Sequence, residues 1–125
     1  MQRVVEFSPH FDALYRGFPT KDQDRIDDFT EHFVSYGLID LPGKIAPSWK
    51  VPGTDPDYYE KQRFAREHRL WHYHVGIPVY TQSRNGNYHT SDWVVHFQRH
   101  PKDLVLRLVD YGFHRPMHMP KIEYL

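Results

Sequence analysis

The chain has 125 residues and no cysteine, so it has the length of one ordinary domain and can form neither disulfide bonds nor thiolate metal sites. Hydrophobic residues make up 39% of the chain and aromatic residues 16%, which argues against intrinsic disorder. No run approaches the roughly 18 apolar residues of a membrane span. We therefore expect one cytoplasmic domain over residues 1–125. The net charge is zero, but residues 1–60 carry six basic and eleven acidic side chains, whereas residues 61–125 carry ten and five, together with eight of the ten histidines.

The N-terminal segment predicts a short strand followed by a short helix. Val4, Val5 and Phe7 give the strand pattern. The dipeptide Ser8-Pro9 then supplies an N-cap and a proline at the first helical position, and the helix is expected to stop near Gly17.

A longer helix is predicted over residues 20–36, where Ile26, Phe29 and Phe33 recur at roughly helical spacing. Residues 20–23 (TKDQ) have the pattern of a capping box, and Gly37 is suited to ending the helix. The apolar face of this helix is expected to pack on a sheet formed by the second half of the chain.

Residues 40–60 contain four prolines and two glycines, which predicts a loop with one short edge strand around Trp49. Beyond the loop, three runs rich in aromatic and β-branched residues predict antiparallel strands: residues 70–77 (LWHYHVGI), 93–98 (WVVHFQ) and 104–111 (LVLRLVDY). The turns between them are predicted at Asn85-Gly86 and at residues 100–103 (HPKD). The expected fold class is α+β.

Two histidines share one face of the first predicted strand. Because side chains two residues apart point the same way, His72 and His74 project together, while Trp71 and Tyr73 project to the opposite face. The pair is compatible with solvated surface residues, with acid–base or phosphate-binding groups, or with two ligands of a metal ion. The candidates for a third metal ligand are Asp92, His89 and His96. No ligand spacing such as HExxH accompanies the pair, so no metal is predicted.

A second polar cluster follows the last predicted strand. Gly112 permits an unusual backbone angle, so His114 and Arg115 are expected to leave the end of the sheet rather than continue it. Such a loop can present side chains to a ligand. The alternative is a C-terminal tail with incidental polar residues.

The sequence has no Gly-rich phosphate loop, no GxSxG turn and no arrangement of paired carboxylates. What remains is His, Arg, Lys and Tyr, which suit a metal-independent cleavage of RNA. In that reaction a base takes the 2′-OH proton, an acid protonates the departing 5′ oxygen, and cations stabilise the phosphorane-like transition state. Aromatic side chains on the same face are suited to stacking bases.

Three motifs occur in order in the second half: residues 69–72 (RLWH), 91–95 (SDWVV) and 111–114 (YGFH). They resemble the RelE/ParE superfamily of bacterial toxins, nearest its YafQ-like ribonucleases, where an RxxH strand, a DW-plus-apolar strand and a G-x-H ending follow one another. The expected order of elements, β-α-α-β-β-β, is similar too. The resemblance therefore implies a single RelE-like toxin domain with two N-terminal helices packed on a small antiparallel sheet.

The resemblance also implies the site residues. His72, Asp92 and His114 are expected to be catalytic, with Asp92 orienting a histidine. His74 or His96 is the alternative to Asp92. The residues expected to bind the substrate are Arg69, His74, His96 and Arg115.

The function implied by the resemblance is that of a toxin of a type II toxin–antitoxin system. It cleaves mRNA on the ribosome without a metal or cofactor and so inhibits translation. Its expected partners are a cognate antitoxin protein and ribosome-bound mRNA, and the assembly is a homodimer or a toxin–antitoxin hetero-oligomer. The alternatives are a ParE-like inhibitor of DNA gyrase, a non-enzymatic RNA- or protein-binding module, and a metal-dependent enzyme.

Overall fold

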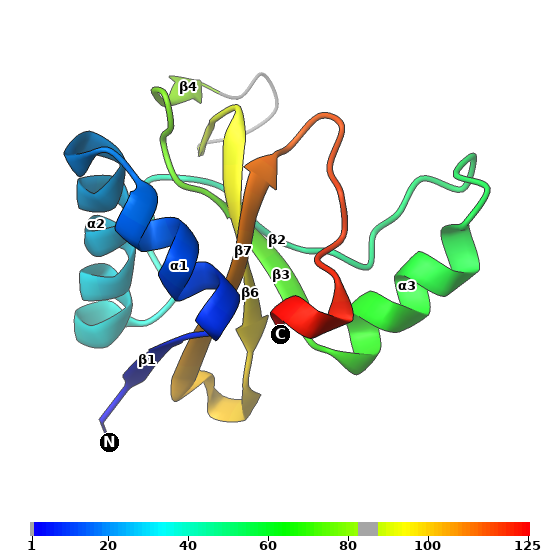
Figure 1. The fold of residues 1–125 in the computed structure, drawn as a ribbon, viewed down its shortest axis with the longest axis horizontal. Helices are drawn as coiled ribbons and strands as arrows, with labels where there is room; N and C mark the ends of the chain where they lie inside the picture. Colours follow the sequence, from blue (N-terminus) through cyan, green and yellow to red (C-terminus); the bar gives the residue numbers. More distant parts are fainter. Residues whose placement is uncertain (1, 83–87) are drawn as a thin grey trace.

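A five-stranded sheet forms the centre of the computed structural model, which describes residues 2–82 and 88–125 (Figure 1). The strands lie in the order β1-β7-β6-β3-β2. Their bounds are Val4–Phe7 for β1, Ile45–Pro47 for β2, Leu70–His74 for β3, Trp93–Arg99 for β6 and Val105–Phe113 for β7. A separate antiparallel pair is formed by β4 (Thr81–Gln82) and β5 (His89–Thr90).

The three central strands confirm the antiparallel order predicted for the second half of the chain. β3 pairs antiparallel with β6, and β6 pairs antiparallel with β7. A short 3-10 helix at Pro101–Asp103 joins β6 to β7, where a turn was predicted. β3 ends at His74, before the predicted end at residue 77, because Gly76 adopts a φ of 83° that does not continue a strand. The predicted turn at Asn85-Gly86 lies outside the described residues.

The sheet is mixed rather than antiparallel, which corrects the predicted fold. β1 pairs in parallel with β7, so that Val4 lies opposite Val105 and Phe7 opposite Leu108. β2 is the predicted edge strand and lies just before Trp49. Side chains alternate in the same way along parallel and antiparallel strands, so the sequence of β1 did not indicate that it pairs in parallel with β7.

Among the described residues, three α-helices accompany the sheet: α1 (Pro9–Gly17), α2 (Thr20–Tyr36) and α3 (Tyr58–Glu67). None of the helices in residues 2–82 and 88–125 is both long and apolar enough to cross a membrane. Ser8 caps α1 as predicted, because its Oγ accepts a hydrogen bond from the N–H of Phe11 at 3.2 Å. The predicted capping box at residues 20–23 is wrong. α2 has no side-chain cap, and the carbonyl of Pro19 accepts the hydrogen bonds of its first turn.

α3 was not predicted, because its sequence, YYEKQRFARE, is largely polar and buries only Ala65. Ala65 packs with Leu70 and Val109 in a small apolar cluster. Figure 1 shows α3 on the other side of the molecule from α1 and α2. The observed order of elements is therefore β-α-α-β-α followed by five strands, which differs from the predicted β-α-α-β-β-β.

The main core lies between α1, α2 and one face of the sheet. Phe29 of α2 stacks on Tyr73 of β3 with ring centroids 4.3 Å apart, and it meets Phe97 of β6 at 5.8 Å. The predicted face of α2, formed by Ile26, Phe29 and Phe33, is buried. Other buried members of this core are Phe11, Val95, Leu106 and Leu108. The packing confirms the predicted contact of helix 20–36 with the sheet, and it fixes which side of β3 faces inward.

We expect Phe29→Ala to lower the free energy of unfolding by about 3–5 kcal/mol, the usual cost of truncating a buried aromatic side chain. Tyr36→Ala, at an exposed position of the same helix, should change it by less than about 0.5 kcal/mol. Urea denaturation followed by circular dichroism measures both values. Equal losses in the two variants would contradict the packing of α2 on the sheet.

Candidate functional site

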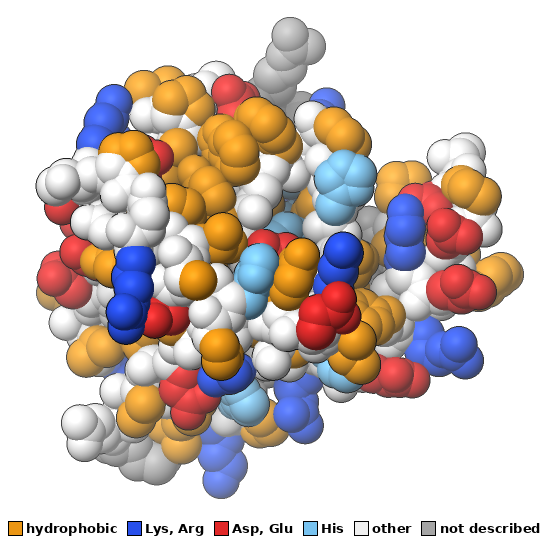
Figure 2. All heavy atoms as spheres, viewed as in Figure 1, with side chains coloured by type: hydrophobic (Ala, Val, Ile, Leu, Met, Phe, Trp, Pro, Cys, Tyr) orange, Lys and Arg blue, Asp and Glu red, His pale blue; other side chains and the backbone are white. Residues whose placement is uncertain are grey.

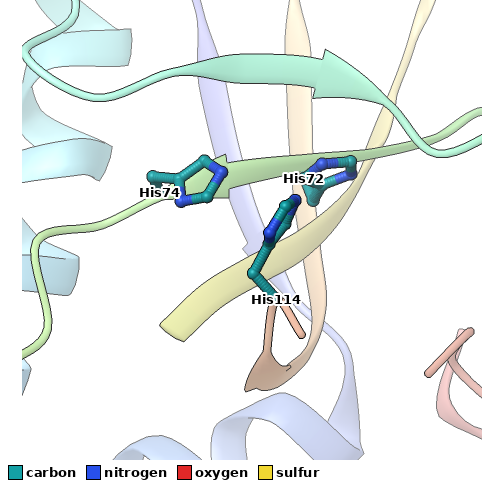
Figure 3. A group of neighbouring side chains, drawn as sticks. All are labelled: His72, His74 and His114. Atoms are coloured by element: carbon teal, nitrogen blue, oxygen red, sulfur yellow. The ribbon is translucent and has the colours of Figure 1, made fainter. Parts of the chain in front are cut away.

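Three histidines from distant segments meet beside the sheet. His72 and His74 belong to β3 and share one face of it, as predicted, and His114 follows the last residue of β7. The ring centroid of His114 lies 5.5 Å from that of His72 and 4.5 Å from that of His74. One ring nitrogen of each residue lies within 4.8 Å of the others. Figure 3 shows the His114 side chain reaching toward the two rings on β3.

Two buried serines fix the rings of His72 and His74. The Oγ of Ser48 lies 2.9 Å from Nδ1 of His72. Nδ1 of His74 lies 2.8 Å from the carbonyl oxygen of Ser91 and 3.0 Å from its backbone nitrogen, so the tautomer decides whether the ring donates or accepts. In both rings these contacts use Nδ1 and leave Nε2 as the atom for a ligand.

The backbone holds His114 at the end of the sheet. Its N–H donates a hydrogen bond to the carbonyl oxygen of Asp92 at 2.8 Å. The side chain of Asp92 is exposed and lines the same cleft as His74 and His114. The unusual backbone angle expected at Gly112 is wrong, because that residue is paired with Val94 within β7. The structure therefore brings Asp92 to the site, where its carbonyl positions His114.

Two clefts meet at His114. One has a volume of about 540 Å³ and contains His74, and the other has a volume of about 590 Å³ and contains His72. Lys44, His114 and Arg115 line both clefts. The site is thus an open groove in which the imidazoles lie beside the basic side chains of Lys44 and Arg115, the two basic residues common to both clefts.

Burial keeps the imidazoles of the site uncharged. It lowers the pKa of His72 to about 3, with the neighbouring histidines and Lys44 acting in the same direction. Burial also lowers the pKa of His114 to about 4, with help from His74, Arg115 and Lys44. The pKa of His74 is lowered by burial too, although its hydrogen bond to Ser91 opposes the shift. All three rings are therefore neutral bases near pH 7.

Most of the described basic side chains of residues 61–125 lie outside the two clefts, and of that half only Lys61 and Arg115 line them. Figure 2 shows acidic and basic side chains interspersed on the face viewed, with imidazoles exposed between them. Within the clefts, Lys44 and Arg115 are opposed by the carboxylates of Asp92 and Asp55, and Asp55 is already paired with Lys61 at 2.6 Å. Attraction for an anion is therefore local to the histidine site.

Two residues predicted to bind the substrate lie away from these clefts. Arg69 is exposed at the start of β3 and lines neither of them. His96 lies opposite His72 on β6, but it is buried and, unlike His72 and His74, lines neither cleft, so it is not open to a substrate there. Burial lowers the pKa of His96 to about 4, and its Nδ1 has no hydrogen-bond partner within the described part of the chain. By contrast, His74 and Arg115 both line the clefts.

Sequence reasoning missed Lys44, Ser48 and Ser91. Lys44 and Ser48 flank β2 in the loop rich in proline and glycine, where no periodicity marks a functional residue. Gly43 is a local signal, because a Cβ there would collide with the carbonyl oxygen of His74, so only glycine allows the loop to approach β3 this closely. The N–H of His74 then donates to the carbonyl of Lys44 at 2.9 Å, which holds Lys44 at the clefts.

In comparisons with known proteins, no family model, no curated protein and no solved structure matches this chain. Its function is therefore inferred from the residues of the site and their geometry.

We expect the rings of His72 and His114 to titrate well below pH 6.5 in an NMR titration with a chelator present. The unfolded chain binds protons at these rings with a pKa near 6.5 and the folded protein does not. The contribution of these two rings to the free energy of unfolding should therefore be fully present above about pH 6.5 and decline as the pH falls from there toward about 4 for His114 and about 3 for His72. Titration of both rings near pH 6.5, with unchanged stability below it, would contradict their burial.

Proposed function

We propose that this protein is the toxin of a type II toxin–antitoxin system, which cleaves mRNA on the ribosome by metal-independent acid–base chemistry in the cytoplasm. The observation that carries the proposal is the group of three neutral imidazoles beside Lys44 and Arg115 in an open groove. Neutral imidazoles accept protons and fixed cations stabilise phosphate charge, which are two requirements of this reaction. The resemblance to RelE-like ribonucleases at His72 and His114 supports the same function.

The proposed reaction breaks one P–O bond and forms another. A neutral imidazole removes the proton of the ribose 2′-OH, and the 2′ oxygen attacks the adjacent phosphorus while the bond to the 5′ oxygen breaks. A second imidazole, which gains its proton when the phosphate anion raises its pKa, donates that proton to the departing 5′ oxygen. The products are a 2′,3′-cyclic phosphate and a free 5′-OH. Lys44 and Arg115 stabilise the negative charge of the transition state.

His114 is the residue best placed to touch the reacting phosphate. It is only partly buried and lies where the two clefts meet, so a strand crossing the groove passes it. We assign His114 and His72 the acid and base roles, and His74, the more deeply held ring, a contact with the phosphate. Asp92 is a positioning residue, because it holds His114 through its backbone carbonyl.

An apolar patch at the end of α2 supports the antitoxin part of the proposal. Tyr36 is 64% exposed and Ile39 is 66% exposed, and both adjoin His32, whose ring centroid lies 5.2 Å from that of Tyr36 and whose Nε2 lies 2.6 Å from the carbonyl oxygen of Ile39. Large apolar side chains exposed close together are typical of protein-binding surfaces. Because a nuclease of this kind must be neutralised while the cell grows, we propose that a segment of the antitoxin covers this patch in a hetero-oligomer.

We expect His114→Gln to reduce RNA cleavage by roughly 10²–10⁴-fold, because glutamine keeps much of the shape of the side chain but cannot transfer protons. The melting temperature should stay within a few degrees of the parent, since the side chain is not part of the core. His72→Gln should reduce cleavage similarly. Cleavage is measured in excess chelator, by mapping new 5′ ends in mRNA after induction in bacteria and by assay on purified ribosomes.

The matched control is His32→Gln, which changes a histidine of α2 outside the clefts and should leave cleavage unchanged. A folded His114→Gln protein that cleaves RNA at the parental rate would refute the assignment. DNA damage signalling without new mRNA ends in the parent would instead support the gyrase inhibitor.

We also expect the double substitution Tyr36→Asp with Ile39→Asp to separate toxicity from neutralisation. The charges should prevent an apolar antitoxin segment from docking, while the histidine site is unchanged. Growth and co-purification are measured with and without co-expression of the product of the neighbouring gene. That product should bind and neutralise the parent but not the variant. Equal neutralisation of both proteins would show that the antitoxin binds elsewhere.

A further inference from the structure

We infer that His72, His74 and His114 also form a reversible binding site for Zn²⁺ or a similar divalent transition-metal ion, and that the bound ion blocks RNA cleavage. The blocking part rests on the proposed function, whereas the binding part does not. Imidazole is a common ligand of such ions, and one nitrogen of each of the three histidines lies within 4.8 Å of the others. Figure 3 shows the three rings gathered around one space.

The distances fit an ion after a small movement of one side chain. Nitrogen ligands at about 2.0–2.1 Å from a tetrahedral zinc ion lie about 3.4 Å from one another, so the nitrogens here need to approach by at most about 1.4 Å. His72 and His74 are held by β3 and by their serines. His114 lies beyond the end of β7, and its ring makes no hydrogen bond to another residue in the described ranges. His114 is therefore the ligand that moves.

The hydrogen bonds made by Nδ1 of His72 and of His74 leave Nε2 of each ring as the atom that can bind a metal ion. When Nδ1–H of His74 donates to the carbonyl oxygen of Ser91, the lone pair of Nε2 is free to bind a metal. Ser48 can accept from Nδ1–H of His72 in the same way, because a hydroxyl oxygen is both donor and acceptor. Hydrogen bonding of this kind at the second ring nitrogen fixes the tautomer of metal-binding histidines in general.

The charges around the site make the binding reversible. Lys44 and Arg115 line both clefts and repel a cation, while Asp92 is the acidic residue of the cleft that contains His74. Three ligands, rather than the four of a structural zinc site, leave the fourth coordination position open to the groove. Water or an anion attracted by the two cations fills that position.

Metal binding and the proposed catalysis use the same lone pairs. An ion held by Nε2 of His72 and by His114 occupies the electron pairs that would accept the 2′-OH proton. It also occupies the space between His114 and β3 where the phosphate is expected to bind. The metal-bound protein is therefore inactive until the ion leaves.

The test of binding uses protein freed of metal with a chelator and then dialysed. Titration with ZnCl₂ by calorimetry should give one ion per chain, and the melting temperature should rise because the ion binds only the folded site. His72→Gln and His114→Gln should each weaken binding at least tenfold, whereas His32→Gln should bind zinc like the parent. Absence of binding, or binding that neither His72→Gln nor His114→Gln weakens, would overturn the site.

The test of inhibition measures RNA cleavage by the parent protein in chelator and during a titration with ZnCl₂. Cleavage should be present in chelator and disappear as zinc saturates the site, with half-inhibition near the calorimetric Kd. Cleavage that persists at saturation, or that requires zinc, would overturn the inhibitory role. If RNA is cleaved under neither condition but one zinc binds the three histidines, the proposed function fails and the metal site stands.

Discussion

The alternation of side chains along β3 is the constraint on which the rest of the structure depends. Tyr73 points to the core, where it stacks on Phe29 and fixes the strand against α2. His72 and His74, one residue to either side, must then point to the opposite face, where they meet His114. A slip of one residue would turn the histidines into the apolar core and expose Tyr73. The packing of the aromatic core therefore also maintains the geometry of the site.

The site combines neutral imidazoles with cationic side chains. His72 and His74 are buried and neutral, and Lys44 and Arg115 line the clefts beside them. A phosphate is attracted by the cations and then meets proton acceptors. A metal ion is repelled by the same cations and is attracted by the nitrogen lone pairs. The proposed substrate and the proposed inhibitor thus respond in opposite ways to the charge of the groove.

Sequence patterns predicted the parts of the fold that local periodicity determines. Helix 20–36, the three central strands and the shared face of His72 and His74 all follow from spacings of two or of about 3.6 residues. α3 lacked such a pattern, because its sequence is mostly polar, and the direction of β1 depends on a partner far along the chain. The position of Lys44 likewise depends on the segment that pairs with β3, and the burial of His96 depends on what covers the face of the sheet that it shares with His72. Each of these features depends on contacts between segments that are distant in the sequence, so the residues of a short segment do not predict it.

β7 lies between β1 and β6 in the sheet, and the residue that follows it is His114. Val4 pairs with Val105, so the sheet joins the beginning of the chain to a strand near its end, and such distant contacts form late in folding. During synthesis, β1 and the two histidines of β3 leave the ribosome well before β7. The three-histidine group exists only after β7 has emerged and paired on both sides. For a protein proposed to cut mRNA on ribosomes, this order of assembly keeps the site incomplete on the ribosome that is making it.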